Sequence, residues 1–258
     1  MSYALITGAS KGIGKAIAEE LAQKGFNILL VARSENLLRE NAEEIKKKFK
    51  VQCDYLPEDL ADPASVQQIF NWCNENHYPV SVLVNNAGFG ICGPFDNSSL
   101  PENMNMMQVN MVTPVLLCQA FIPLLRQQQK AYILNVGSTT AYHAIPLMAL
   151  YAATKVFVLR FSRGLHEELK KTNISVTCVC PGTTDTDFSY QARVNPKAIK
   201  TGEKVSMSPA AVARIAVKGM MQKKKEVVPG FINKLTVFLV WLLPLNLSER
   251  TAFKIYRQ

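Results

Sequence analysis

The chain has 258 residues, of which 48% are hydrophobic and 19% are charged, and its formal net charge is +9. This length suits one α/β domain with a substantial core, and the composition excludes a largely disordered chain. The positive charge fits a polyanionic cofactor or an anionic membrane surface, but no zinc-finger spacing or nucleic-acid motif accompanies it, so we exclude nucleic acid as the main partner.

Short apolar runs alternate with longer segments of helical periodicity, a pattern typical of βαβ units. The predicted strands are Ala4–Thr7, Asn27–Ala32, Val51–Cys53, Val82–Asn85, Tyr132–Val136, Ser175–Cys180 and Glu226–Val228. The predicted helices are Ile13–Lys24, Glu35–Phe49, Pro63–Asn74, Glu102–Gln128, Leu150–Lys171 and Pro209–Met221. Asp62 and Ser208 each precede a proline and are expected to cap the helix that follows. Right-handed crossovers predict a single Rossmann-like, doubly wound α/β domain with a seven-stranded, mainly parallel sheet.

The loop after the first predicted strand contains three glycines, Gly8, Gly12 and Gly14. Glycine permits a tight strand-to-helix turn and lets backbone amides approach a pyrophosphate at the helix N-terminus. The loop therefore predicts dinucleotide binding, and the alternative is a tight turn without a ligand. The glycine spacing differs from the common GxGxxG form.

The second predicted strand ends at Ala32 and is followed by Arg33 and Ser34, so it lacks the acidic residue that would bind a ribose 2′-hydroxyl. Arg33 offers a planar guanidinium suited to a 2′-phosphate, and Lys11 in the glycine loop would supply a second charge. These residues favour NADP(H) over NAD(H). In the alternative interpretation, Arg33 stacks on adenine or faces solvent.

Tyr151 and Lys155 are four residues apart in a predicted helix, so their side chains share one face. At roughly 4 Å and an effective dielectric of about 20, a lysine ammonium favours the phenolate by about 4 kcal/mol, which would lower the tyrosine pKa by about 3 units. A phenol with a pKa near neutrality suits general acid/base catalysis. By itself, the spacing also fits any surface helix.

Taken in order, these motifs resemble those of the short-chain dehydrogenase/reductase family over residues 3–190. The glycine loop resembles the TGxxxGxG signature, and Tyr151 with Lys155 resembles the YxxxK pair. Asn110 and Ser138 complete a match to the catalytic tetrad. The resemblance implies that Ser138 orients a substrate carbonyl and that Tyr151 donates or accepts the proton. It also implies that Lys155 binds the nicotinamide ribose and that Asn110 holds a proton-relaying water.

The same resemblance implies a nucleotide site built from the loops that follow the strands. Asp59 and Leu60 would line the adenine, and Thr186 would lie near the nicotinamide carboxamide. The complete predicted cofactor set is Gly8, Ser10, Lys11, Gly12, Ile13, Gly14, Arg33, Asp59, Leu60, Asn86, Ala87, Gly88, Tyr151, Lys155, Pro181, Gly182 and Thr186. His77 and His166 have no ligand partners at useful spacing, so no metal site is predicted.

We therefore expect an NADP(H)-dependent oxidoreductase that interconverts a ketone or aldehyde and an alcohol by hydride transfer, with Tyr151 as general acid/base. The first alternative is a non-catalytic NADP(H)-binding regulatory protein on the same fold, although such proteins typically lose the tyrosine or the lysine. The second is a sugar-nucleotide epimerase or dehydratase, against which the glycine spacing argues. The resemblance also implies a homodimer or homotetramer.

Residues 1–230 are expected to form the nucleotide-binding and catalytic part of the domain, and residues 183–207 a substrate loop whose basic residues are solvated or attract an anionic group. Residues 231–258 are expected to form a helical tail of the same domain. The tail contains an apolar run, Leu235–Leu243, which is shorter than the roughly 20 residues needed to span a membrane. Ser248 is expected to cap a second short helix.

The tail is expected to dock over the substrate pocket or against another subunit, with peripheral membrane contact as the alternative. Family members with similar tails act on acyl chains or steroids, which favours a lipophilic substrate. The start of the chain offers no signal peptide and the six cysteines form no CxxC pair. We therefore expect reduced thiols and a cytoplasmic protein, which is membrane-associated if the tail contacts lipid.

Overall fold

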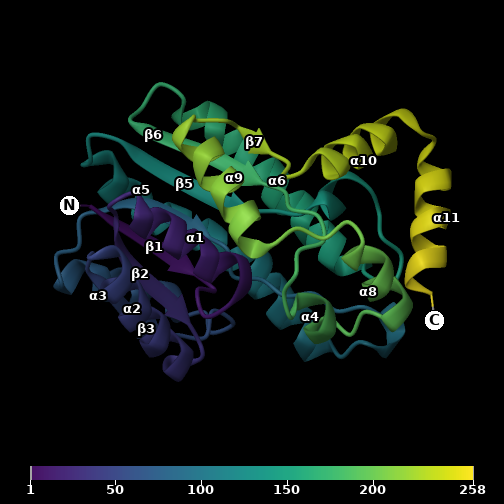
Figure 1. Ribbon diagram of the computed structural model, residues 1–258, viewed down its shortest axis with the longest axis horizontal. Coiled ribbons are helices and arrows are strands. Elements are labelled where there is room, and N and C mark those ends of the chain that lie inside the picture. Colours follow the sequence, from purple (N-terminus) through teal and green to yellow (C-terminus); the bar gives the residue numbers. More distant parts are fainter. Residues whose placement is uncertain (1, 258) are drawn as a thin grey trace.

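Seven strands form one parallel sheet in the computed structural model, which describes residues 2–257 (Figure 1). The strands are β1 (Tyr3–Thr7), β2 (Asn27–Ala32), β3 (Cys53–Pro57), β4 (Val80–Asn85), β5 (Ala131–Val136), β6 (Ile174–Val179) and β7 (Glu226–Val227). Their order across the sheet is β3-β2-β1-β4-β5-β6-β7, and every neighbouring pair is parallel. The predicted doubly wound α/β fold is confirmed, and the order reverses between β1 and β4, where such sheets bind ligands.

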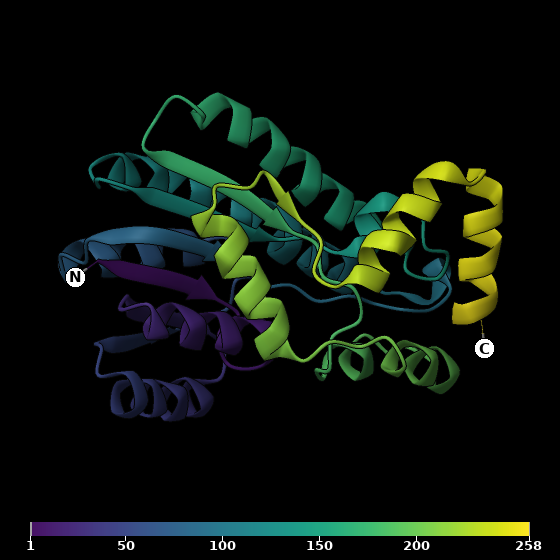
Figure 2. The same cartoon turned by 45° about the horizontal axis from the view of Figure 1, so that its top comes forward.

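Helices cover both faces of this sheet (Figures 1 and 2). One face packs against α1 (Gly12–Gln23), α2 (Glu35–Phe49) and α9 (Pro209–Met221). The other packs against α3 (Ser65–Glu75), α5 (Thr113–Arg126) and α6 (Ala149–Leu169). Neighbouring strand residues therefore enter opposite cores, which explains why the strands are continuous apolar runs. Leu5 and Ile6, for example, are both fully buried in different cores, and each burial stabilises the fold by about 1.5–3 kcal/mol.

The remaining helical segments lie at the C-terminal edge of the sheet and beyond it. They are η1 (Phe95–Asn97), α4 (Leu100–Met107), η2 (Gln108–Val112), η3 (Thr139–Tyr142), α7 (Phe188–Gln191), α8 (Pro196–Glu203), α10 (Phe231–Leu242) and α11 (Leu245–Tyr256). The segment after β6, predicted as a loop, contains α7 and α8. Helices α10 and α11 extend from the end of the molecule opposite β3 (Figure 2).

Several predicted boundaries were wrong. The third strand was expected at Val51–Cys53, but pairing with β2 begins at Cys53 and continues to Pro57. β3 is an edge strand, so the missing amide of Pro57 is tolerated there. Asp62 accepts a hydrogen bond from the Ala64 amide at 2.8 Å in a turn, and α3 begins only at Ser65.

The helix predicted over residues 102–128 is interrupted by the π-turn η2, and Ser248 lies within α11 rather than at its start. By contrast, Ser208 caps α9 as predicted, because its hydroxyl accepts from the Ala211 amide at 3.3 Å. Within the described chain, the segment Leu100–Arg126 is long and apolar enough to match a membrane-spanning helix by length and composition. Its residues Leu117 and Phe121 are buried against the sheet, as in core helices of globular domains.

Candidate active site

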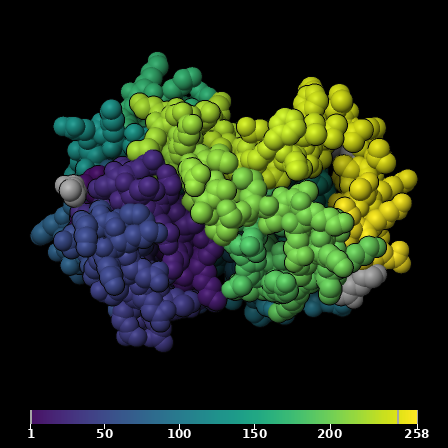
Figure 3. Space-filling view, in the orientation of Figure 1, coloured from purple at the N-terminus to yellow at the C-terminus, as the bar shows by residue number. Residues whose placement is uncertain are grey.

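A cavity of about 940 Å³ lies at the C-terminal edge of the sheet, between the strand-end loops and the segment after β6 (Figure 3). This volume is at the upper end of the usual range for small-molecule sites. Every residue predicted to bind the cofactor lines the cavity, as do Ser138, Tyr151 and Lys155. Asn110 does not line it and lies behind the wall.

The glycine loop is held against β4 by a network around Thr7. The Thr7 hydroxyl accepts hydrogen bonds from the backbone amides of Asn86 at 3.0 Å and Ala87 at 3.1 Å. The Asn86 side chain donates to the carbonyls of Thr7 and Gly8. A Cβ atom on Gly14 would lie 2.2 Å from the Gly8 carbonyl oxygen, so only glycine permits this contact between the loop and the first turn of α1. The N-terminus of α1 faces the cavity, where it favours a phosphate.

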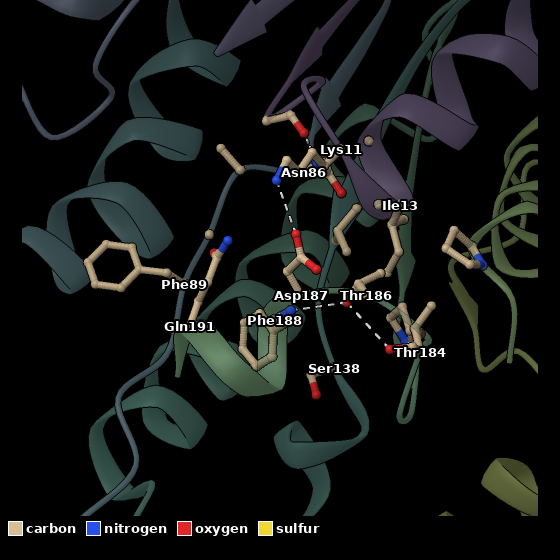
Figure 4. Close-up of a pocket in the computed structure, with 18 of the residues that line it drawn as sticks. Lys11, Ile13, Asn86, Phe89, Ser138, Thr184, Thr186, Asp187, Phe188 and Gln191 are labelled. Atoms are coloured by element: carbon tan, nitrogen blue, oxygen red, sulfur yellow. Dashed lines mark hydrogen bonds and ion pairs between the residues drawn. The ribbon is translucent and has the colours of Figure 1, made fainter. Parts of the chain in front are cut away.

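The two cations predicted to bind a 2′-phosphate lie in different surroundings. Arg33 is exposed at the end of β2 and lines the cavity beside Asp59. Lys11 instead reaches across the cavity and contacts the carboxylate of Asp187, at the start of α7, at 3.1 Å (Figure 4). Both side chains of this ion pair are largely exposed, so it contributes only about 0–1 kcal/mol. Lys11 can therefore exchange Asp187 for a phosphate at little energetic cost.

Lys155 lies almost fully buried beneath the cavity floor. Its ammonium donates a hydrogen bond to the Val136 carbonyl at 3.0 Å and lies 5.8 Å from the centre of the Tyr151 ring. Asn110, in the π-turn, donates to the Phe89 carbonyl at 2.9 Å and to the Thr154 hydroxyl at 3.0 Å. The Asn110 amide thus joins the loop after β4 to α6 and holds the wall behind Lys155.

Gly88 separates the Asn110 side chain from Lys155. A Cβ atom at Gly88 would lie 3.0 Å from the Asn110 amide oxygen and 3.3 Å from the Lys155 ammonium. The three residues therefore form one closely packed group, although Asn110 has no surface on the cavity itself.

Burial dominates the electrostatics of Tyr151 and Lys155, whose exposed fractions are 7% and 5%. Burial raises the pKa of Tyr151 above its ordinary value, and a hydrogen bond with Ser138 only partly offsets this effect. Burial also lowers the pKa of Lys155 to about 8. The expectation that Lys155 brings the tyrosine pKa near neutrality is therefore not met by the protein groups alone. The phenol is protonated at pH 7, which is the form that donates a proton.

Two aromatic residues near Tyr151 were not predicted as site residues. Phe188, in α7, packs on the Tyr151 ring with 5.3 Å between centroids. Tyr256, the last residue of α11, also lines the cavity, and a negative charge on its phenol raises the pKa of Tyr151. Asn195 fixes the end of α11 by donating to the Tyr256 carbonyl at 2.6 Å. Phe188 follows Thr186 closely in the sequence, which was a usable signal, whereas no sequence pattern places Tyr256 at the site.

This arrangement can polarise and protonate a carbonyl. The Ser138 hydroxyl, at the start of η3, and the Tyr151 phenol face one space in the cavity and offer two hydrogen-bond donors to the same oxygen. The glycine loop and the start of α1, at the other side of the cavity, are suited to binding phosphates.

Comparison with known proteins agrees with this geometry. The family model described as short chain dehydrogenase matches residues 2–197. The very-long-chain 3-oxoacyl-CoA reductase-B of Danio rerio is 34% identical over 191 residues, which are 72% of this chain and 61% of that protein. The chain thus spans about three fifths of the length of this curated relative.

Two solved structures share the whole fold. A short-chain dehydrogenase from Sphingobium yanoikuyae in complex with NADPH is 27% identical, with a TM-score of 0.81 and coverage of 95% of this chain and 97% of the other. A 7beta-hydroxysteroid dehydrogenase, 23% identical, has a TM-score of 0.87 with coverage of 97% and 96% and supports the fold alone. The chain therefore belongs to the short chain dehydrogenase family of oxidoreductases.

Proposed function

We propose that this protein is an NADP(H)-dependent oxidoreductase that interconverts a ketone or aldehyde and an alcohol. The observation that carries the proposal is the meeting of Ser138, Tyr151 and Lys155 in the cavity formed by the glycine loop. A regulatory protein that only senses the nucleotide needs no buried phenol beside a buried ammonium.

The nucleotide, when bound, supplies or accepts the hydride. The Ser138 hydroxyl orients the substrate carbonyl and stabilises negative charge that develops on its oxygen. Tyr151 donates its proton to that oxygen during reduction and accepts it during oxidation. The Lys155 ammonium stabilises the phenolate that Tyr151 leaves behind and binds the nicotinamide ribose. Asn110 holds a water molecule through which Lys155 regains a proton.

The proposed preference for NADP(H) rests on Arg33 and Lys11. Arg33 is exposed at the adenosine side of the cavity, and the end of β2 carries no carboxylate to bind a ribose 2′-hydroxyl or repel a phosphate. The NADPH complex of the Sphingobium relative supports the same preference. Titration of the protein with NADPH and NADH tests it, and equal affinities would contradict it.

The proposed substrate is lipophilic, because apolar side chains surround the part of the cavity next to Tyr151. These are Phe89, Met148, Phe188 and Val194. The name of the Danio rerio relative, a reductase of very-long-chain 3-oxoacyl-CoA, supports the same class. The decisive experiment follows NADPH absorbance at 340 nm with fatty-acyl, steroid, retinal and quinone carbonyls, comparing wild type with Tyr151→Phe. NADPH binding without turnover across this panel would instead indicate the regulatory alternative.

We further propose a cytoplasmic homodimer or homotetramer. All six cysteines are unpaired, which suits a reducing compartment. Val112 of η2 and Val156 and Phe157 of α6 are apolar and exposed, and supply a surface for subunit contact. Light scattering during size-exclusion chromatography of the purified protein measures its subunit number.

A further inference from the structure

Helix α10 presents its large apolar side chains to solvent. Phe231, Leu235, Phe238 and Leu242 recur at helical spacing and form one exposed stripe. Trp241 beside them is 79% exposed. Helices of globular proteins in water have the opposite arrangement, with apolar residues turned inward.

The inward side of α10 carries the polar anchor of the helix. Asn233 is buried and donates a hydrogen bond to the Pro229 carbonyl at 2.8 Å. Gly182, at the cavity, leaves space for this side chain, because a Cβ atom there would lie 2.2 Å from the Asn233 amide oxygen. The orientation of α10 is therefore fixed by the fold, and its apolar stripe is held outward.

The exposed stripe needs a cover, but α10 is too short to cross a bilayer. The helix has 12 residues, whereas a membrane-spanning helix needs about 20. Figures 1 and 2 show α10 and α11 together at one end of the molecule, away from the sheet. A helix placed in this way can lie in the plane of a membrane interface with its apolar side in the acyl region.

Charge distinguishes a bilayer from a second copy of the chain as the cover. Helices α10 and α11, with the residue that follows α11, carry four exposed cations, Lys234, Arg250, Lys254 and Arg257. Glu249, the only acidic residue of the described tail, is half-buried and interacts electrostatically with His143 on the body of the domain. A two-fold contact through this end would bring the cations of two copies together, whereas anionic headgroups attract them.

We propose that the outer faces of α10 and α11 are a docking surface for a lipid bilayer with anionic headgroups. Helix α10 lies in the interface plane with its apolar stripe among the acyl chains. The four cations of the tail contact the headgroups. The catalytic proposal is independent of this surface, since none of the stripe residues or tail cations lines the cavity.

Tryptophan fluorescence tests the docking directly. The chain has two tryptophans, and Trp72 lies on α3 at the other end of the molecule. In a Trp72→Phe background, Trp241 reports on α10 alone. Vesicles of phosphatidylcholine with phosphatidylglycerol should shift its emission to the blue and should bind at least about tenfold more protein than phosphatidylcholine alone, with salt reducing the difference.

Matched variants identify the surface. Phe238→Glu with Leu242→Glu should abolish vesicle binding, and Arg250→Gln with Lys254→Gln should reduce the preference for anionic vesicles. Leu100→Glu on α4 is the control, because Leu100 is also an exposed apolar residue, and it should leave vesicle binding unchanged. NADPH binding verifies that each variant folds.

Two results would overturn the proposal. One is an unshifted Trp241 emission with anionic vesicles. The other is that the wild-type protein is an oligomer that binds no vesicles, whereas the Phe238→Glu, Leu242→Glu variant is a monomer. The surface would then be a subunit interface.

Discussion

Replacement of Lys155 by methionine tests the burial of the active-site ammonium. Methionine keeps a long, unbranched side chain but carries no charge. Burial holds the pKa of Lys155 at about 8 in the folded protein, against an ordinary 10.5. Since one pKa unit corresponds to about 1.4 kcal/mol, the charged lysine lowers the free energy of unfolding by about 3 kcal/mol at pH 7.

The sign of the pH dependence follows from the protons bound in each state. Between pH 8 and pH 10.5 the unfolded protein keeps the Lys155 proton and the folded protein releases it, so stability rises with pH in this window. Between pH 7 and pH 9.5, wild type should gain about 2 kcal/mol of unfolding free energy relative to Lys155→Met. Lys155→Met also loses the hydrogen bond to Val136, which is worth about 1 kcal/mol. This loss lowers the unfolding free energy of the variant equally at pH 7 and pH 9.5, so the gain of wild type relative to the variant between the two pH values is unchanged.

Urea unfolding of both proteins at pH 7 and pH 9.5, without added nucleotide, measures the effect. The neighbouring thiols of Cys178 and Cys180 are present in both proteins, so their titration largely cancels in the comparison. Lys130→Met, at an exposed lysine, is the control and should follow wild type at both pH values. A stability difference between wild type and Lys155→Met that is constant or shrinks with pH would refute the reasoning.

Four further changes test the site. Tyr151→Phe removes the proton donor and should lower kcat by about 10²–10⁴-fold while NADPH binding, measured by fluorescence titration, is retained. Arg33→Gln should weaken NADPH binding by about 10- to 100-fold, the loss of a charge-assisted contact, and leave NADH binding nearly unchanged in calorimetry. Gly14→Ala places a Cβ atom 2.2 Å from the Gly8 carbonyl oxygen and should lower the free energy of unfolding by about 2 kcal/mol or more in urea titrations. Tyr256→Ala enlarges the cavity and should raise KM for long-chain carbonyls by about tenfold with unchanged NADPH affinity, as steady-state kinetics would show.

The parts of the fold that depend on local pattern were predictable from the sequence. The apolar run of β2 specifies a strand, and Ser208 before Pro209 specifies the start of α9 through a local hydrogen bond. Asp62 before Pro63 shows the same pattern but forms only a turn, because α3 begins at Ser65. The edge strand β3 was placed too early, because Asp54 and Pro57 resemble loop residues and only pairing with β2 makes them a strand. The π-turn around Asn110 likewise depends on contacts with Phe89 and Thr154, which are distant in the sequence.

The loops that line the cavity were predictable because each of their motif residues lies within a few residues of a strand end. Tyr256 was not predictable, since its place at the cavity depends on how α11 folds back over the domain. That path is fixed by the hydrogen bond from Asn195 to the Tyr256 carbonyl and by burial of Ala252 beside Tyr151 and Met148. Such contacts join segments with no shared pattern, so a single sequence carries no signal for them.

The opposite pKa shifts of Tyr151 and Lys155 explain how one buried site suits proton transfer. Burial disfavours the phenolate and the ammonium alike, so each group resists the charged form when it is considered alone. When Tyr151 gives up its proton, however, the phenolate forms close to the Lys155 ammonium, where the low dielectric strengthens their attraction. In the proposed reduction, the site would therefore stabilise the phenolate–ammonium pair more than either charge by itself, and removal of Lys155 should slow proton donation even though it stabilises the fold.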